Sequence, residues 1–186
     1  METLYATIRR RLAGEGRLLL AIDGRCGCGK SSLAARLAAD FGAAVFHMDD
    51  YYLPFSARAE NWREIPAGNM DLERLRIEVL EPLRRGETPR CRPYDVRADR
   101  FLPERAVPPG ALAIVEGSYS QHPALRDYYG FRLFVTASPE TQRARLLARE
   151  GEHFAAFEAL WIPLEERYFR AFSIEERADY VLRTDG

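Results

Sequence analysis

The sequence predicts an α/β domain in which helices cover a buried parallel sheet. Short continuous apolar runs alternate along the chain with segments of helical periodicity, and strands that are buried on both faces have such unbroken runs. Two of these runs end in an acidic residue followed by glycine. The 186 residues suit one domain with a sizeable core, so we expect a single domain over residues 1–186.

The expected elements alternate in type. Predicted helices cover residues 1–13, 30–41, 71–85, 139–150 and 154–172, and predicted strands cover residues 18–22, 43–48, 111–115, 131–136 and 180–182. Gly42 and Gly86 follow two of these helices and are typical of a helix C-terminus. Ser138-Pro139 is typical of a helix start. Pro163 lacks the amide hydrogen that a helix interior uses, so we expect it to kink or split the last helix.

Two proline-rich segments interrupt the alternation. Residues 51–70 and 87–110 both adjoin strand ends. In an open parallel sheet this edge is where ligands bind, and loops of this length in a compact domain are usually functional or mobile. We therefore expect residues 51–70 and 87–105 to form an insert beside a substrate.

Composition and charge exclude several classes of partner. The formal net charge is −1, so neither nucleic acid nor an anionic membrane is expected as a bulk partner. The sequence has no secretory signal and no apolar stretch as long as a membrane span. Cys26, Cys28 and Cys91 do not form a disulfide framework. They favour a reducing compartment, and the expected location is cytoplasmic.

A glycine-rich motif lies between the first strand and the second helix. Residues 24–31, GRCGCGKS, match G-x-x-x-x-G-K-[ST] at every fixed position, and such a loop surrounds phosphate oxygens with backbone N–H groups. Lys30 is the only lysine in the chain; its compact ammonium suits the β- and γ-phosphates better than a planar guanidinium. The Ser31 hydroxyl can bind Mg²⁺. The expected nucleotide-binding residues are Gly24, Arg25, Cys26, Gly27, Cys28, Gly29, Lys30, Ser31 and Ser32.

Cys26 and Cys28 lie inside this motif. A zinc site needs more ligands than one Cys-x-Cys pair provides, so we interpret both as small side chains that fill the loop. Because a helix N-terminus lowers the pKa of nearby thiols, sensitivity to oxidation is a hypothesis.

Carboxylates follow two other strands. Asp49 and Asp50 follow the strand at 43–48, and Glu116 follows the strand at 111–115. Phosphoryl transfer uses one carboxylate to hold Mg²⁺ and one to accept the proton of the attacking hydroxyl. We expect Asp49 to be the base, with a share in metal binding, and Glu116 to organise the metal. We interpret Asp50 as a loop cap and Asp23 as structural.

Six stretches together resemble the uridine kinase-like group of P-loop kinases, which includes relatives of phosphoribulokinase and pantothenate kinase. They are residues 23–32, 48–53 (MDDYYL), 69–75 (NMDLERL), 92–95 (RPYD), 115–123 (VEGSYSQHP) and 161–169 (WIPLEERYF). The resemblance implies a three-layer P-loop NTPase fold with five parallel strands flanked by helices, a small β-hairpin and a short lid. It also implies ATP or GTP as donor and Mg²⁺ as cofactor.

The resemblance implies roles for individual residues. The family's catalytic base falls on Asp49, its substrate-facing aromatic on Tyr52 and its strand-end acid on Glu116. Tyr94 would lie near the acceptor on the hairpin. The family's acidic substrate motif does not align cleanly, and Asn69 or Asp71 is the candidate to replace it.

The family's lid arginines fall at the end of the helix 139–150. Arg149 is the best match in a lid at about residues 143–153. The resemblance implies that this lid covers the triphosphate, with Arg149 in a catalytic role and Arg145 at the nucleotide. Arg143 and Arg145 are weaker matches, for which a solvated helix face is an equal alternative.

Aromatic and histidine residues outside these motifs have two interpretations. His122 either touches substrate or makes a structural hydrogen bond, and Trp62 either stacks on a flat base or packs its own loop. We interpret His47 as a packed residue, because it lies within a strand. Trp161, Tyr168 and Phe169 lie at helical spacing and are interpreted as core.

The sequence therefore predicts a kinase whose acceptor is a small-molecule hydroxyl. A nucleoside such as uridine or cytidine is the leading acceptor, and pantothenate or a sugar phosphate is the alternative. The rival from another class is a nucleotide-dependent switch without an acceptor; the N-K-x-D stretch of a GTPase is absent from the sequence. The sequence leaves open whether the chain forms a homo-oligomer.

Overall fold

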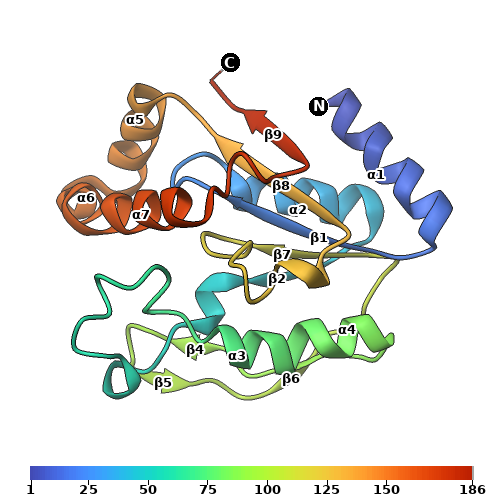
Figure 1. The fold of residues 1–186 in the computed structure, drawn as a ribbon, viewed down its shortest axis with the longest axis horizontal. Coiled ribbons are helices and arrows are strands. Elements are labelled where there is room, and N and C mark those ends of the chain that lie inside the picture. Colours follow the sequence, from blue (N-terminus) through green and yellow to red (C-terminus); the bar gives the residue numbers. More distant parts are fainter. Residues whose placement is uncertain (186) are drawn as a thin grey trace.

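Five parallel strands form the central sheet of the computed structural model, which describes residues 1–185 (Figure 1). They are β1 (Leu18–Gly24), β2 (Ala44–His47), β7 (Leu112–Glu116), β8 (Phe131–Thr136) and β9 (Tyr180–Arg183). Their order is β2-β7-β1-β8-β9, and each neighbouring pair is parallel. This confirms the predicted fold class.

Helices cover both faces of the sheet (Figure 1). On one face, α1 (Glu2–Glu15) and α2 (Lys30–Phe41) pack through leucine and isoleucine onto the strands, and the buried residues there include Leu4, Ile8, Leu37, Ile22 and Ile114. On the other face lie the helix at 72–85 and α7 (Ile162–Phe172), and the buried residues there include Val79, Leu80, Tyr168, Phe169 and Phe134. The apolar faces of these helices thus account for the three layers.

Two helices contain a π-helical segment. The helix at 72–85 comprises α3 (Leu72–Leu75), the π segment Arg76–Leu80 and α4 (Glu81–Arg85). Similarly, α5 (Pro139–Glu150) and a short 3₁₀ turn are followed by α6 (Phe154–Ala156), the π segment Phe157–Trp161 and α7. A proline is the second residue after each π segment, Pro82 in α4 and Pro163 in α7, where the wider spacing accommodates the missing N–H. The helix 154–172 is therefore not split at Pro163.

The two proline-rich segments form an insert beside the sheet. Two short antiparallel ladders pair β3 (Arg90–Cys91) with β6 (Arg105–Ala106) and β4 (Tyr94–Asp95) with β5 (Arg100–Phe101). The ends of the segment 51–70 are held together by two backbone hydrogen bonds, from Leu53 N to Asn69 O at 2.8 Å and from Asp71 N to Tyr51 O at 2.7 Å. The segment is thus a closed loop anchored after β2.

Strand order determines which residues meet at the carboxyl edge of the sheet. β7 lies between β2 and β1, and Glu116 pairs with Ile22 on one side and His47 on the other. The ends of these three strands therefore adjoin the start of α2, at the position where open α/β sheets bind ligands. Among residues 1–185, the structure contains no helix with the length and apolarity needed to cross a membrane.

Candidate active site

The glycine-rich loop turns sharply from β1 into α2. Its glycines Gly24, Gly27 and Gly29 have φ of 138°, 74° and 86°, values that L-residues with a side chain rarely adopt. A Cβ on Gly24 would lie 1.9 Å from Val135 O, so this position also needs glycine for the close approach of β8. The first N–H groups of α2 have no partner within the helix. The loop and helix start together form a cradle for an anion.

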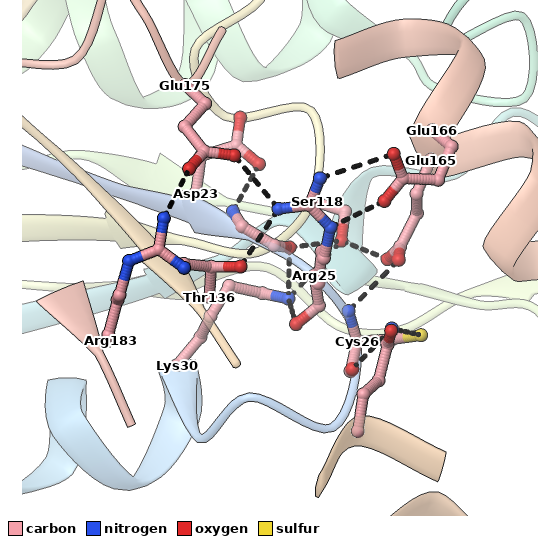
Figure 2. A network of polar contacts seen from close by, with 12 residues as sticks. Asp23, Arg25, Cys26, Lys30, Ser118, Thr136, Glu165, Glu166, Glu175 and Arg183 are labelled. Carbon is pink, nitrogen blue, oxygen red and sulfur yellow. Dashed lines mark hydrogen bonds and ion pairs between the residues drawn. The ribbon is translucent and has the colours of Figure 1, made fainter. Parts of the chain in front are cut away.

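Lys30 begins α2 and turns its ammonium back onto the loop (Figure 2). Its Nζ donates to Gly24 O at 2.7 Å, to Arg25 O at 3.1 Å and to Ser118 Oγ at 3.3 Å. All three partners are neutral oxygens. The positive charge has no carboxylate partner among the described residues, which leaves it available for phosphate oxygens.

Ser31, Glu116 and His47 form a chain of polar contacts next to Lys30. The Ser31 hydroxyl lies 3.2 Å from Glu116 Oε2, and His47 Nδ1 lies 2.6 Å from Glu116 Oε1. The hydrogen bond to Glu116 raises the pKa of His47. A hydroxyl beside a carboxylate is a hard-oxygen donor set that suits Mg²⁺.

His47 corrects one prediction from the sequence. We interpreted it as a packed residue, but its side chain is 46% exposed and it orients Glu116, whose side chain is only 7% exposed. A histidine that holds a ligating carboxylate is a common outer partner of a metal site. Within residues 1–185, no three His, Cys, Asp or Glu side chains are grouped to hold a metal ion, so Mg²⁺ would be shared with the phosphates of a nucleotide.

Asp49 lies in the 3₁₀ turn Met48–Tyr51 that follows β2. Tyr52 donates its hydroxyl to Asp49 Oδ1 at 3.3 Å, and the Tyr52 ring lies 6.5 Å from the Trp161 ring. Burial raises the pKa of Asp49, Glu116 raises it further, and Lys30 opposes both effects. Asp49 itself is exposed to solvent, and a carboxylate whose pKa is raised by its neighbours is a better proton acceptor than an isolated one.

Carboxylates of α7 and of the segment after it contact Arg25 and Cys26 of the glycine-rich loop (Figure 2). Arg25 pairs through Nε with Glu166 Oε1 at 2.5 Å and through Nη1 with Glu175 Oε2 at 3.0 Å. Glu165, which is 6% exposed, accepts the Cys26 N–H at 3.0 Å and the hydroxyl of Ser118. Sequence reasoning missed these acids, because consecutive glutamates on a helix resemble a solvated face.

Asp23 braces the end of β1. Its carboxylate is fully buried and accepts Gly24 N at 2.7 Å, Gln121 N at 2.9 Å and the Tyr168 hydroxyl at 2.8 Å. Burial raises the pKa of Asp23 to about 6, against these hydrogen bonds. The side chain faces the protein interior, as its interpretation as a structural residue predicted.

The two loop cysteines have surroundings that oppose sensitivity to oxidation. Cys26 and Cys28 are free and buried. Burial raises the pKa of both thiols, and the nearby Glu165 raises that of Cys26 further. The buried environment thus opposes the effect of the helix N-terminus on these thiols, and their sensitivity to oxidation stays a hypothesis.

A cavity of about 550 Å³ adjoins the outer side of the loop. Its lining includes Gly27, Ser32, Arg36, Arg145, Arg149 and Thr184. Arg145 donates to Thr184 Oγ1 at 2.9 Å and to Thr184 O at 2.5 Å, whereas Arg149 is half-exposed and contacts Glu150. The fold thus brings together Ser32, the end of α5 and the residue after β9 in a space open to a nucleotide. Arg143 instead pairs with Glu158 at 3.6 Å.

Three other candidate residues use their polar atoms within the protein. Tyr94 is buried and donates its hydroxyl to Asp99. Asp71 caps α3 by accepting Arg74 N at 3.0 Å, and it also pairs with Arg74 Nε. His122 packs against the rings of Tyr168 and Phe172. Each of these contacts is a structural one.

Comparison with solved structures gives the fold. No family model matches the chain, and no curated protein matches it. A possible uridine kinase from Bacillus stearothermophilus is 25% identical, with a TM-score of 0.66 over 89% of this chain and 88% of that chain. A candidate fructose transport system kinase from Silicibacter sp. TM1040 is 24% identical, with a TM-score of 0.68 over 89% of each chain. Shikimate kinase from Acinetobacter baumannii is 18% identical, with a TM-score of 0.51 over 94% of this chain and 87% of that chain. The chain therefore has the three-layer fold of P-loop kinases.

Proposed function

We propose that this chain is a kinase that transfers the γ-phosphoryl group of ATP to the hydroxyl of a small molecule. The observation that supports the proposal best is the meeting of Lys30, the Ser31–Glu116 pair and Asp49 at one edge of the sheet. An anion cradle, a hard-oxygen metal site and a carboxylate base are the parts that phosphoryl transfer to an alcohol requires.

In this proposal the donor lies along the start of α2. The backbone N–H groups of the loop and the Lys30 ammonium hold the β- and γ-phosphates, and the cavity lined by Arg145 and Arg149 takes the rest of the nucleotide. Ser31 and Glu116 would hold Mg²⁺, with Asp49 as a further candidate ligand, and the bound ion would offset charge on the phosphate oxygens. ATP is the first donor to test and GTP the alternative.

Asp49 accepts the proton of the attacking hydroxyl in this mechanism. Its carboxylate is held by Tyr52, and its pKa is raised by burial and by Glu116. The hydrogen bond from Tyr52 and the raised pKa of Asp49 both favour proton transfer near neutral pH. Arg149, at the end of α5, is the lid residue that would approach the transferring group and stabilise its charge.

The acceptor is a small alcohol. A pyrimidine nucleoside is the first to test, on the resemblance of the sequence to uridine kinases and the likeness to a possible uridine kinase. A sugar, a sugar phosphate or pantothenate is the alternative, and a sugar is favoured by the likeness to a candidate fructose transport system kinase. Residues 51–70 and 87–105 would form the acceptor side of one domain, and the expected location is the cytoplasm.

The experiment measures ADP formation with Mg·ATP in the presence and absence of nucleosides, sugars, sugar phosphates and pantothenate. A kinase forms ADP in step with a phosphorylated product that mass spectrometry detects. Equal ADP formation with every acceptor and with none would favour the rival interpretation, a nucleotide-dependent switch.

A further inference from the structure

The loop that follows Asp49 holds a cation that makes no ion pair among the described residues. Arg58 Nε donates to Leu53 O at 3.1 Å, and the guanidinium lies over the rings of Phe55 and Trp62 at 4.4 and 5.3 Å. Its Nη2 atom is buried and has no hydrogen-bond partner. Among residues 1–185, Arg58 makes no ion pair, although other partly buried arginines such as Arg25 and Arg132 contact carboxylates.

A second donor without a partner belongs to the same loop. Asn69 is 2% exposed, and its Nδ2 atom makes no hydrogen bond. Leu53 connects the two residues, because its N–H donates to Asn69 O at 2.8 Å and its carbonyl accepts Arg58 Nε. Both unpartnered atoms are donors, so each of them needs an acceptor.

The missing partner has an energetic consequence. Removing a guanidinium from water is unfavourable unless an anion pairs with it. Burial accordingly lowers the pKa of Arg58, and the charge of Asp99 opposes this only in part. Native proteins rarely leave buried donors unpaired, and an ion or ligand is one explanation for such an exception. A bound anion would remove the cost at Arg58.

These donors belong to the acceptor side of the candidate base. Leu53, which holds both residues, directly follows Tyr52, and Tyr52 donates to Asp49 at 3.3 Å. We propose that Arg58 and Asn69 bind a carboxylate or phosphate group of the acceptor, so that the substrate is an anionic small alcohol and not a neutral nucleoside. This inference rests on the proposed kinase function. It selects the charged members of the alternative acceptor class, because a planar guanidinium matches carboxylate and phosphate oxygens alike.

The test compares related acceptors with and without a carboxylate or phosphate group. Pantothenate is paired with pantothenol, glycerate with glycerol, and fructose 1-phosphate with fructose, and uridine and cytidine complete the panel. Product formation with Mg·ATP gives kcat/KM for the full chain and for Arg58→Ala and Asn69→Ala. Arg63→Ala is the matched control, because the Arg63 guanidinium lies over the same Trp62 ring, at 5.4 Å, and its backbone oxygen stays bonded to Arg167.

We expect the charged member of one pair to be the best acceptor. Arg58→Ala should raise its KM by about 10- to 100-fold, the loss expected for a charged hydrogen bond. The same variant should leave the neutral partner unchanged, and Arg63→Ala should change neither. A neutral acceptor that is preferred, or an equal loss for both members in Arg58→Ala, would overturn the inference while leaving the kinase proposal intact.

A binding measurement separates failure of this inference from failure of the kinase proposal. The chain is loaded with Mg²⁺ and a non-hydrolysable ATP analogue, and its melting temperature is recorded with each member of the pairs. A rise with charged members that disappears in Arg58→Ala supports the anion site, even if no product forms and the kinase proposal fails. The absence of any charge-dependent rise overturns the anion site, whatever the activity.

Discussion

Glu165 anchors the phosphate loop to α7, and its removal should destabilise the fold measurably. In Glu165→Ala the Cys26 N–H loses its acceptor at 3.0 Å, and the Ser118 hydroxyl loses its carboxylate partner. A hydrogen bond to a charged group contributes about 1.5–3 kcal/mol, and a buried donor left unpaired costs a similar amount. We therefore expect a loss of about 3 kcal/mol in the free energy of unfolding, or about 6–12 °C in Tm for a domain of this size.

Glu165→Gln provides the conservative comparison. Its remaining carbonyl oxygen can accept the Cys26 N–H, and Ser118 can donate to Gly24 O, which lies 3.2 Å from its Oγ. The expected loss is about 1 kcal/mol, the value of a charged over a neutral hydrogen bond.

Urea unfolding followed by circular dichroism measures both losses. Glu158→Ala is the control, because Glu158 is exposed on the neighbouring π segment and pairs with Arg143 only at 3.6 Å; its loss should stay below about 1 kcal/mol. If Glu165→Ala unfolds at the same urea concentration as Glu158→Ala, the anchoring role is refuted.

Three further predictions concern the base, the histidine beside Glu116 and the thiols. Asp49→Asn should lower kcat by about 100-fold or more with little change in nucleotide affinity, whereas an equal loss in Asp50→Asn would deny Asp49 a special role. Because Glu116 raises the pKa of His47, the protonated imidazole stabilises the fold fully below its ordinary pKa of about 6.5 and loses this effect as pH rises through the folded value. With metal chelated, the difference in unfolding free energy between the wild type and His47→Leu should therefore shrink with rising pH, and a constant difference would contradict this. Iodoacetamide should modify Cys26 and Cys28 only after unfolding, as mass spectrometry of the folded protein would check.

Local signals account for the parts of the molecule that could be predicted from its sequence. The strand 18–22, the motif 24–31 and the helix 30–41 each have a pattern contained within a few residues, and the structure has β1, the loop and α2 there. The parallel order of the sheet follows from the alternation of strands and helices. The individual elements depend on neighbouring residues alone, and the parallel direction of the strands depends only on the order of the elements along the chain.

Contacts between distant segments could not be predicted in the same way. Glu165 meets Cys26 across 139 residues and Ser118 across 47, and no local pattern distinguishes it from the adjacent Glu166. The residues next to His47 in the sequence indicate a strand but do not show how exposed its side chain is. That exposure depends on the position of β2 at the edge of the sheet and on the pairing of His47 with Glu116 in β7. Arg58 is one arginine among many in this chain, and its lack of a partner emerges only from the folded loop.

Titration of the chain with Mg²⁺ and a non-hydrolysable ATP analogue tests the phosphate cradle most directly. Calorimetry should detect binding at one site, and Lys30→Ala should weaken it by about 30-fold or more, as expected when a charged donor to phosphate is lost. A wild-type chain that binds no analogue, or a Lys30→Ala chain that binds it equally well, would contradict the account.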